Sequence, residues 1–131
     1  MFKPLLLVVA TFGLAVPATA QNDAPPTRIQ FARGTSSKAI PGAVRGYDGK
    51  RYVIGARAGQ RLTVTLRTSN ASNYFNVTAP GASAAMEGGA NQTRFTTTIP
   101  SSGDYVIDVY LMRNAARRNE SAKYTLTVGI R

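Results

Sequence analysis

Apolar and polar residues alternate with period two along most of the chain, which is typical of strands with one buried face. The clearest case is the segment 123–130, where apolar residues share one face and Lys and Thr share the other. Similar rows occur at 29–31, 52–56, 62–67 and 105–111, separated by clusters of Gly, Pro, Asn and Ser. The inward rows that we expect to form the core are Leu62, Val64, Leu66, Ile107, Val109, Leu126 and Val128.

This pattern predicts an all-β fold. About eight short strands with no long segment of helical period indicate an antiparallel β-sandwich in a single domain. Two stretches depart from the alternation. Residues 80–92 are rich in Gly and Ala, and we interpret them as a flexible connection between strands. Residues 113–122 form a loop longer than a tight hairpin needs, and such loops are often functional.

The first twenty residues have the features of an export signal. An early lysine precedes an apolar run, and the segment ends in Ala18-Thr19-Ala20. We therefore expect residues 1–20 to be a signal peptide cleaved near Ala20, residues 21–26 to be a flexible lead-in, and residues 27–131 to be the β-sandwich domain. The protein should then be periplasmic or secreted. The absence of cysteine means that its core alone must hold the fold together.

Composition excludes most catalytic chemistry. The chain has no cysteine and no histidine, so it can form neither a thiol nucleophile nor a histidine relay, nor a thiolate or imidazole metal site. Carboxylate chemistry remains, but Asp104 and Asp108 lie four residues apart on one strand face, roughly 13 Å by the strand rise. That separation is too large for an ordinary glycosidase pair. We expect a binding protein that is not an enzyme and that needs no cofactor and no metal.

The charge points to acidic partners. The net charge is +10, and most of the cations are arginine, the residue suited to bidentate recognition of carboxylate and phosphate. One helical turn within 113–118 would place Arg113 and Arg117 side by side at i and i+4. Export and the lack of a basic and aromatic platform argue against a nucleic-acid partner.

Two turns supply further candidate contacts. Tyr47 stands between two glycines beside charged residues, and an exposed tyrosine is a favoured interface residue. In the second turn, Ser102 and Gly103 precede a strand that opens with Tyr105. A serine hydroxyl at a turn can bond a partner, whereas a tyrosine opening a sandwich strand more often packs inward and bonds nearby backbone.

Together these motifs resemble a known family, the periplasmic inhibitors of g-type lysozyme. The resemblance rests on Gly46-Tyr47-Asp48, on Pro100-x-Ser102-Gly103-x-Tyr105 and on Arg113-Asn114-x-Ala116-Arg117, and it covers almost the whole mature chain. It implies a β-sandwich that pushes loops into the active-site cleft of a g-type lysozyme and so protects the bacterial cell wall. The related inhibitors of i-type lysozyme share the Ser-Gly-x-Tyr turn, so an i-type partner stays open.

The resemblance also implies roles for individual residues. Ser102, in the turn with Gly103 and Tyr105, would reach the catalytic glutamate of the lysozyme. Arg113 and Arg117 would pair with acidic and carbonyl groups of the cleft, and Tyr47 would pack at its rim. The chain departs from the family by placing Asp104 in the turn, beside the expected position of the lysozyme carboxylate.

A second resemblance leads to a different function. Residues 52–66, with the later Pro-Ser-Ser-Gly-Asp-Tyr, are similar to accessory β-sandwiches that follow the catalytic domains of secreted peptidases. Such a module would bind matrix or anionic envelope polymers, but its pattern has no arginine-rich loop. Lysozymes are themselves commonly cationic, so attraction must be local to the cleft, and the excess charge is suited to contact with the anionic cell envelope.

Overall fold

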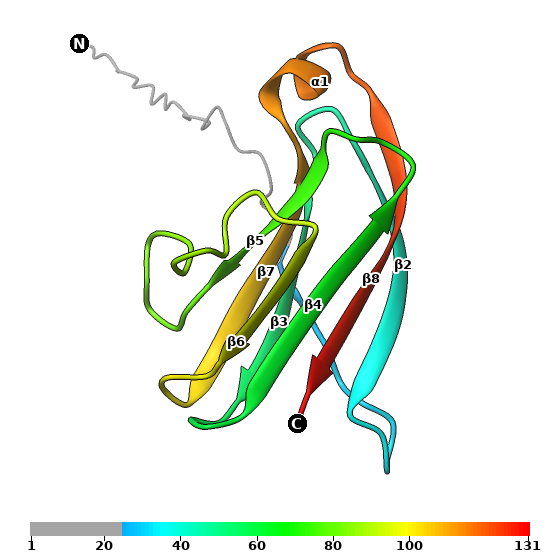
Figure 1. Cartoon of the computed structure of the whole chain (residues 1–131). Coiled ribbons are helices and arrows are strands. Elements are labelled where there is room, and N and C mark those ends of the chain that lie inside the picture. Colours follow the sequence, from blue (N-terminus) through cyan, green and yellow to red (C-terminus); the bar gives the residue numbers. More distant parts are fainter. Residues whose placement is uncertain (1–24) are drawn as a thin grey trace, which may run out of the picture.

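The fold is a sandwich of two packed β-sheets. The computed structural model describes residues 25–131, so the predicted signal peptide 1–20 and residues 21–24 of the lead-in lie outside the described residues. Within 25–131 there are eight strands and one short helix, and Figure 1 shows the two sheets lying face to face. The predicted all-β sandwich is confirmed. No helix in the described part of the chain is long and apolar enough to cross a membrane.

Each sheet has four strands. The first has the order β1 (Thr27–Arg28), β3 (Lys50–Ala56), β7 (Gly103–Leu111) and β5 (Asn73–Thr78). The second has the order β2 (Ser37–Arg45), β8 (Ser121–Ile130), β4 (Arg61–Thr68) and β6 (Arg94–Thr98). Every pair is antiparallel except β1 and β3, which run parallel. The predicted antiparallel sandwich therefore has one parallel pair at a short edge strand, which is possible because β2, in the other sheet, lies between β1 and β3 in sequence.

The core lies between the inward rows of the two sheets. All seven residues expected there are buried, and only Leu66 has measurable exposure, at 6%. One polar contact crosses this apolar layer: the hydroxyls of Tyr52 on β3 and Tyr124 on β8 lie 2.7 Å apart. Burial, followed by this hydrogen bond, raises the pKa of Tyr124, so its phenol stays neutral. A Cβ at the paired Gly42 would lie 2.4 Å from the Tyr124 hydroxyl, so the ring requires glycine there.

The connection 80–92 is attached to the sheet instead of being a free linker. The amide of Val77 donates to Gly89 O at 2.8 Å, and Met86 N donates to Val77 O at 2.7 Å. Phe75 and Gln92 exchange two backbone hydrogen bonds of 2.9 Å. The physical reason is that β5 is an edge strand, whose unpaired backbone groups need partners. Composition alone therefore did not predict that this segment is attached to β5.

The inward rows lead to a stability prediction. Leu126 is fully buried at the centre of β8, and we expect Leu126→Ala to lower the free energy of unfolding by about 2–5 kcal/mol through lost burial and a residual cavity. Urea denaturation measures this change. The control Thr96→Ala, on the exposed side of edge strand β6, should cost less than about 1 kcal/mol. Equal losses for the two variants would contradict the assigned face of β8.

Candidate functional site

Three connections meet at one end of the sandwich. They are the β2–β3 turn (46–49), the β4–β5 loop (69–72) and the segment 112–120, which contains helix α1 (Arg113–Arg117). We call this region the α1 end, and it lies at the top of Figure 1, away from the C-terminus. Met112 N donates to Ser72 O at 2.9 Å, and Gly46 N donates to Glu120 O at 2.8 Å, so the three connections are bonded to each other.

Helix α1 presents two arginines to solvent. Ala115 and Ala116 are buried at 0% and 3% exposure, which fixes the helix on the core, while Arg113 and Arg117 are exposed. The predicted single helical turn is confirmed, with Arg113 and Arg117 at i and i+4. The one side-chain hydrogen bond that either makes with the described residues runs from Arg117 Nη2 to Asn114 Oδ1 at 3.3 Å. Most of their donors therefore face water and are available to a partner.

Glu120 holds the α1 end together, a role that no local sequence pattern indicates. Its Oε1 accepts from Asn70 Nδ2 at 3.0 Å, its Oε2 accepts from Arg118 Nε at 2.9 Å, and its carbonyl accepts the Gly46 amide. The hydrogen bond from Asn70, followed by that from Arg118, lowers the pKa of the Glu120 carboxyl. One residue thus bonds the β2–β3 turn, the β4–β5 loop and the end of the helical segment.

The buried side-chain amide of Asn73 supports the β4–β5 loop on the side that faces the core. Asn73 has no exposed surface; its Oδ1 accepts from Thr68 Oγ1 at 2.7 Å, and its Nδ2 donates to Tyr110 O at 2.9 Å. Both polar atoms of the side chain are satisfied, so burial costs little. This arrangement joins the end of β4 to β7 beneath the α1 end.

The large apolar side chains that the described residues leave exposed also lie at the α1 end. Tyr47, at the tip of the β2–β3 turn, is 56% exposed, and Met112, just before α1, is 38% exposed. Gly46 makes the turn feasible: its φ is +57°, and a Cβ there would lie 2.7 Å from Asn119 Oδ1. Sequence reasoning did not identify Met112 as exposed, because an apolar residue that directly follows a strand usually belongs to the core.

The other predicted contact residues lie at the opposite end. Ser102 Oγ accepts from Ala58 N at 2.9 Å, which ties the β6–β7 turn to the β3–β4 turn. Tyr105 is fully buried and its hydroxyl donates to Ser101 O at 2.7 Å. Gly103 packs so closely on Pro80 that a Cβ would lie 2.7 Å from the proline ring. The nine-residue strand β7 separates this turn from α1, by roughly 27 Å at the usual rise.

The carboxylates considered for catalysis are instead paired with arginines. Arg28 donates to both oxygens of Asp104 at 3.2 and 2.7 Å, and this bonding lowers the pKa of Asp104. Arg51 Nε donates to Asp108 Oδ1 at 3.0 Å, although burial raises the pKa of Asp108. Within residues 25–131 no group of three or more potential metal-ligating side chains lies together.

Comparisons with known proteins agree with the fold and with the family that the sequence resembles. No family model matches the sequence. The inhibitor of g-type lysozyme of Escherichia coli strain K12 is 28% identical over 111 residues, covering 79% of each chain. The crystal structure of Aeromonas hydrophila PliG, a periplasmic inhibitor of g-type lysozyme, superposes with a TM-score of 0.70 at 36% identity, covering 81% of this chain and 96% of that one. The chain belongs to the family of periplasmic inhibitors of g-type lysozyme.

A second solved structure of this inhibitor family extends the likeness to the full length of a relative. Salmonella Typhimurium PliG superposes with a TM-score of 0.64 at 28% identity, covering 86% of this chain and all of that one. The similarity therefore includes both ends of the sandwich and does not by itself select one of them as the contact surface.

The bonds of Glu120 lead to a pH prediction for this member of the inhibitor family. A lowered folded-state pKa means that folding stabilises the carboxylate; this contribution is complete above the unfolded-state pKa and is lost as the pH falls through the folded one. We expect the free energy of unfolding to fall in acid, below about pH 4. Glu120→Gln should lose less stability than the parent between pH 7 and pH 3 in urea titrations.

The matched control is Glu87→Gln, whose exposed carboxylate makes no ion pair with the described residues. It should keep the acid sensitivity of the parent. If Glu120→Gln also keeps the full sensitivity, the carboxylate does not hold the α1 end together.

Proposed function

We propose that the protein is a periplasmic inhibitor of g-type lysozyme that places its α1 end in the active-site cleft of the enzyme. The proposal is supported by family membership, since the relatives are described as inhibitors of g-type lysozyme. The observation that carries the choice of surface is the gathering of Tyr47, Met112, Arg113 and Arg117, all exposed, at one end. Residues 1–20 would be the export signal that delivers the domain 27–131 to the periplasm.

The α1 end has side chains that can bind in an active-site cleft and block it. Two guanidinium groups one helical turn apart can donate to the carboxylates and carbonyls of a cleft that binds glycan. Tyr47 and Met112 add apolar surface beside them, as interface residues of these types commonly do. The buried alanines of α1 and the bonds of Glu120 hold the backbone that carries these groups, so little backbone entropy would be lost on association.

One cleft can receive only one end of the sandwich. Ser102 and Gly103 lie beyond the full length of β7 from Arg113, so a cleft that holds α1 does not also hold the Ser102 turn. Ser102 Oγ already accepts a backbone amide, and Tyr105 is buried, which favours a structural role for that turn. Contact of Ser102, Gly103 and Tyr105 with lysozyme stays a prediction, and we give it second place.

Short-range contacts between arginines and an acidic cleft would allow two proteins of net positive charge to bind. Repulsion over long range is screened at physiological salt, where the Debye length is about 8 Å. Arg113 and Arg117 would act only at short range, inside an acidic cleft where water is excluded. Asp104, which stood near the expected position of a lysozyme carboxylate, is neutralised by Arg28 and lies at the other end. It therefore adds no repulsion to this mode of binding.

The proposed function is tested by lysis assays against g-, i- and c-type lysozymes. We expect the mature protein to stop lysis by the g-type enzyme at about one inhibitor per enzyme without being consumed, and to spare the c-type enzyme. Inhibition of the i-type enzyme would widen the partner class. Correctly folded protein that inhibits none of the three would reject the proposal in favour of a module that binds matrix or envelope polymers.

Truncation of the Arg117 side chain tests whether the α1 end is the surface that contacts lysozyme. We expect Arg117→Ala to cost roughly 2–4 kcal/mol of affinity for g-type lysozyme, mostly by faster dissociation, because it strands a charge in the cleft. Surface plasmon resonance measures both rates. The control Arg33→Ala removes the same charge from an exposed loop, where an ion pair would be worth about 0–1 kcal/mol.

Ser102→Ala separates the two ends of the sandwich. The Ser102 hydroxyl accepts a hydrogen bond from the Ala58 amide. Its loss should therefore reduce the free energy of unfolding, seen as a lower melting temperature, by more than it reduces the free energy of binding to lysozyme. A loss of affinity from Ser102→Ala that exceeds the loss from Arg117→Ala would move the contact surface to the opposite end. Equal, small and salt-sensitive losses for Arg33→Ala and Arg117→Ala would show that the charge acts only as a diffuse field.

A further inference from the structure

The outer face of the second sheet carries cations without acids. Strands β2, β8, β4 and β6 alternate, so every second residue points away from the core. The outward positions of these four strands contain no Asp or Glu. Six exposed cations lie on this face or at its ends, and they are Arg45, Arg61, Arg67, Arg94, Lys123 and Arg131.

The first sheet shows the opposite arrangement. Its outer face pairs Arg28 with Asp104 and Arg51 with Asp108, so its cations are largely neutralised within the protein. None of the six cations of the second sheet makes an ion pair with another residue of 25–131. The outer face of the second sheet therefore carries more uncompensated positive charge than the outer face of the first.

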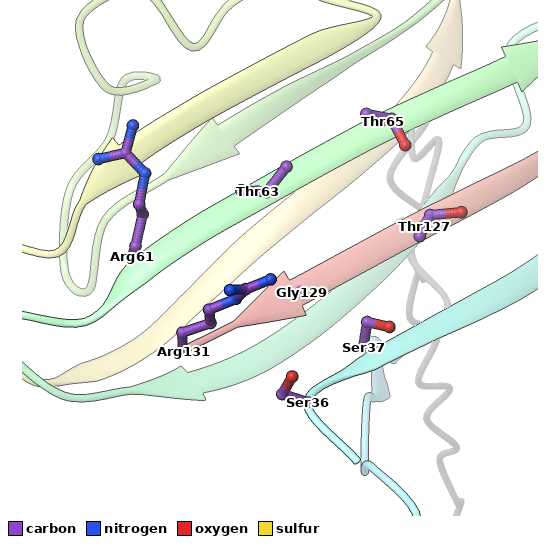
Figure 2. Close-up of a pocket in the computed structure, with 8 residues that line it drawn as sticks. All are labelled: Ser36, Ser37, Arg61, Thr63, Thr65, Thr127, Gly129 and Arg131. Carbon is purple, nitrogen blue, oxygen red and sulfur yellow. The ribbon is translucent and has the colours of Figure 1, made fainter.

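Hydroxyl groups line a groove on the same face. Figure 2 shows Thr63, Thr65 and Thr127 along neighbouring strands, with Arg61 and Arg131 beside them. Gly129 has no side chain to fill the space, and Ser36 and Ser37 close one side, which leaves a groove of about 400 Å³. The groove thus offers both charged donors and neutral groups that can donate or accept.

We propose that this face binds an anionic polysaccharide, with its acidic groups on the arginines and its hydroxyls on the threonines. Guanidinium groups suit carboxylate and phosphate oxygens, while threonine hydroxyls can exchange hydrogen bonds with neutral sugar hydroxyls. Arg61 and Arg67 lie six residues apart on β4, which is roughly 20 Å at the strand rise. A polymer of several sugar units matches this length, whereas a single small anion would reach one end only.

The composition of the face favours a glycan over other polyanions. Its outward positions carry no aromatic residue, so single-stranded nucleic acid has no surface on which to stack. The exposed apolar residues there are small, namely Ala39, Pro41 and Ala43, and give little to insert into a lipid bilayer. Rows of hydroxyls, by contrast, match a polymer whose units carry hydroxyls as well as charges.

This inference goes beyond the proposed function and does not depend on it. The α1 end and the outer sheet face are different surfaces, so an inhibitor held on an envelope glycan would still present Arg113 and Arg117. Such retention would keep the protein beside the polymer layer that a lysozyme attacks.

The test uses polygalacturonate, a linear polyuronate, as the probe in isothermal titration calorimetry with the mature protein. We expect Arg61→Gln/Arg67→Gln to weaken binding by about tenfold or more, because two charge-assisted contacts are lost. The control Arg33→Gln/Arg57→Gln removes the same charge from exposed loops and should weaken binding by less than about twofold. Equal losses would overturn the proposal, since they would show that only net charge matters.

A second pair of variants tests the hydroxyls without changing the charge. Thr65→Val/Thr127→Val keeps the shape and β-propensity of both residues, and we expect it to weaken polygalacturonate binding by about threefold to tenfold. Unchanged affinity would overturn the glycan assignment, as would tighter binding of duplex DNA or of anionic phospholipid vesicles than of polygalacturonate. Melting temperatures confirm that each variant is folded. Retained inhibition of g-type lysozyme by Arg61→Gln/Arg67→Gln keeps failure of this proposal distinct from failure of the proposed function.

Discussion

Burial of two sets of alternating apolar rows between the sheets is the constraint on which everything else depends. The protein has no cysteine, so no covalent link supports the sandwich. The inner residues of β4, β7 and β8 are almost all fully buried, and the hydroxyl pair of Tyr52 and Tyr124 is a polar contact across the layer. Because both hydroxyls are satisfied by each other, this contact fixes how the sheets face each other without leaving a buried polar group unpaired.

The rigid layer leaves the two ends of the sandwich free to differ. At one end, short turns are tied by Ser102 and by the buried Tyr105, and none of the described residues there exposes a large apolar side chain. At the other end, a helical turn and two loops are joined by Glu120 and present exposed arginines with Tyr47 and Met112. Preorganisation by Glu120 matters because the backbone that carries the arginines is already held, so less conformational entropy of the loops is lost on binding.

The two sheet faces likewise differ in how they treat charge. Carboxylates on β7 neutralise arginines on the first sheet, whereas the second sheet has no acidic residue among its outward positions. A net charge of +10 therefore does not describe a uniformly basic surface. It describes a cationic outer face on the second sheet, a first sheet whose arginines are paired with carboxylates, and an α1 end that exposes Arg113 and Arg117.

The sequence by itself determined the local features: the strands, which side of each strand is buried, the helical turn that pairs Arg113 with Arg117, and a family resemblance that the comparisons confirm. These follow from periodicities of two and 3.6 residues, which depend only on neighbouring residues. Tertiary structure alone decided that Ser102 and Arg113 lie at opposite ends, that 80–92 pairs with the edge of β5, and that Glu120 meets Asn70 and Gly46. Glu120 and Asn70 are 50 residues apart in sequence, and no local pattern encodes such a contact. Their meeting depends on which strand ends the packing of the two sheets brings together.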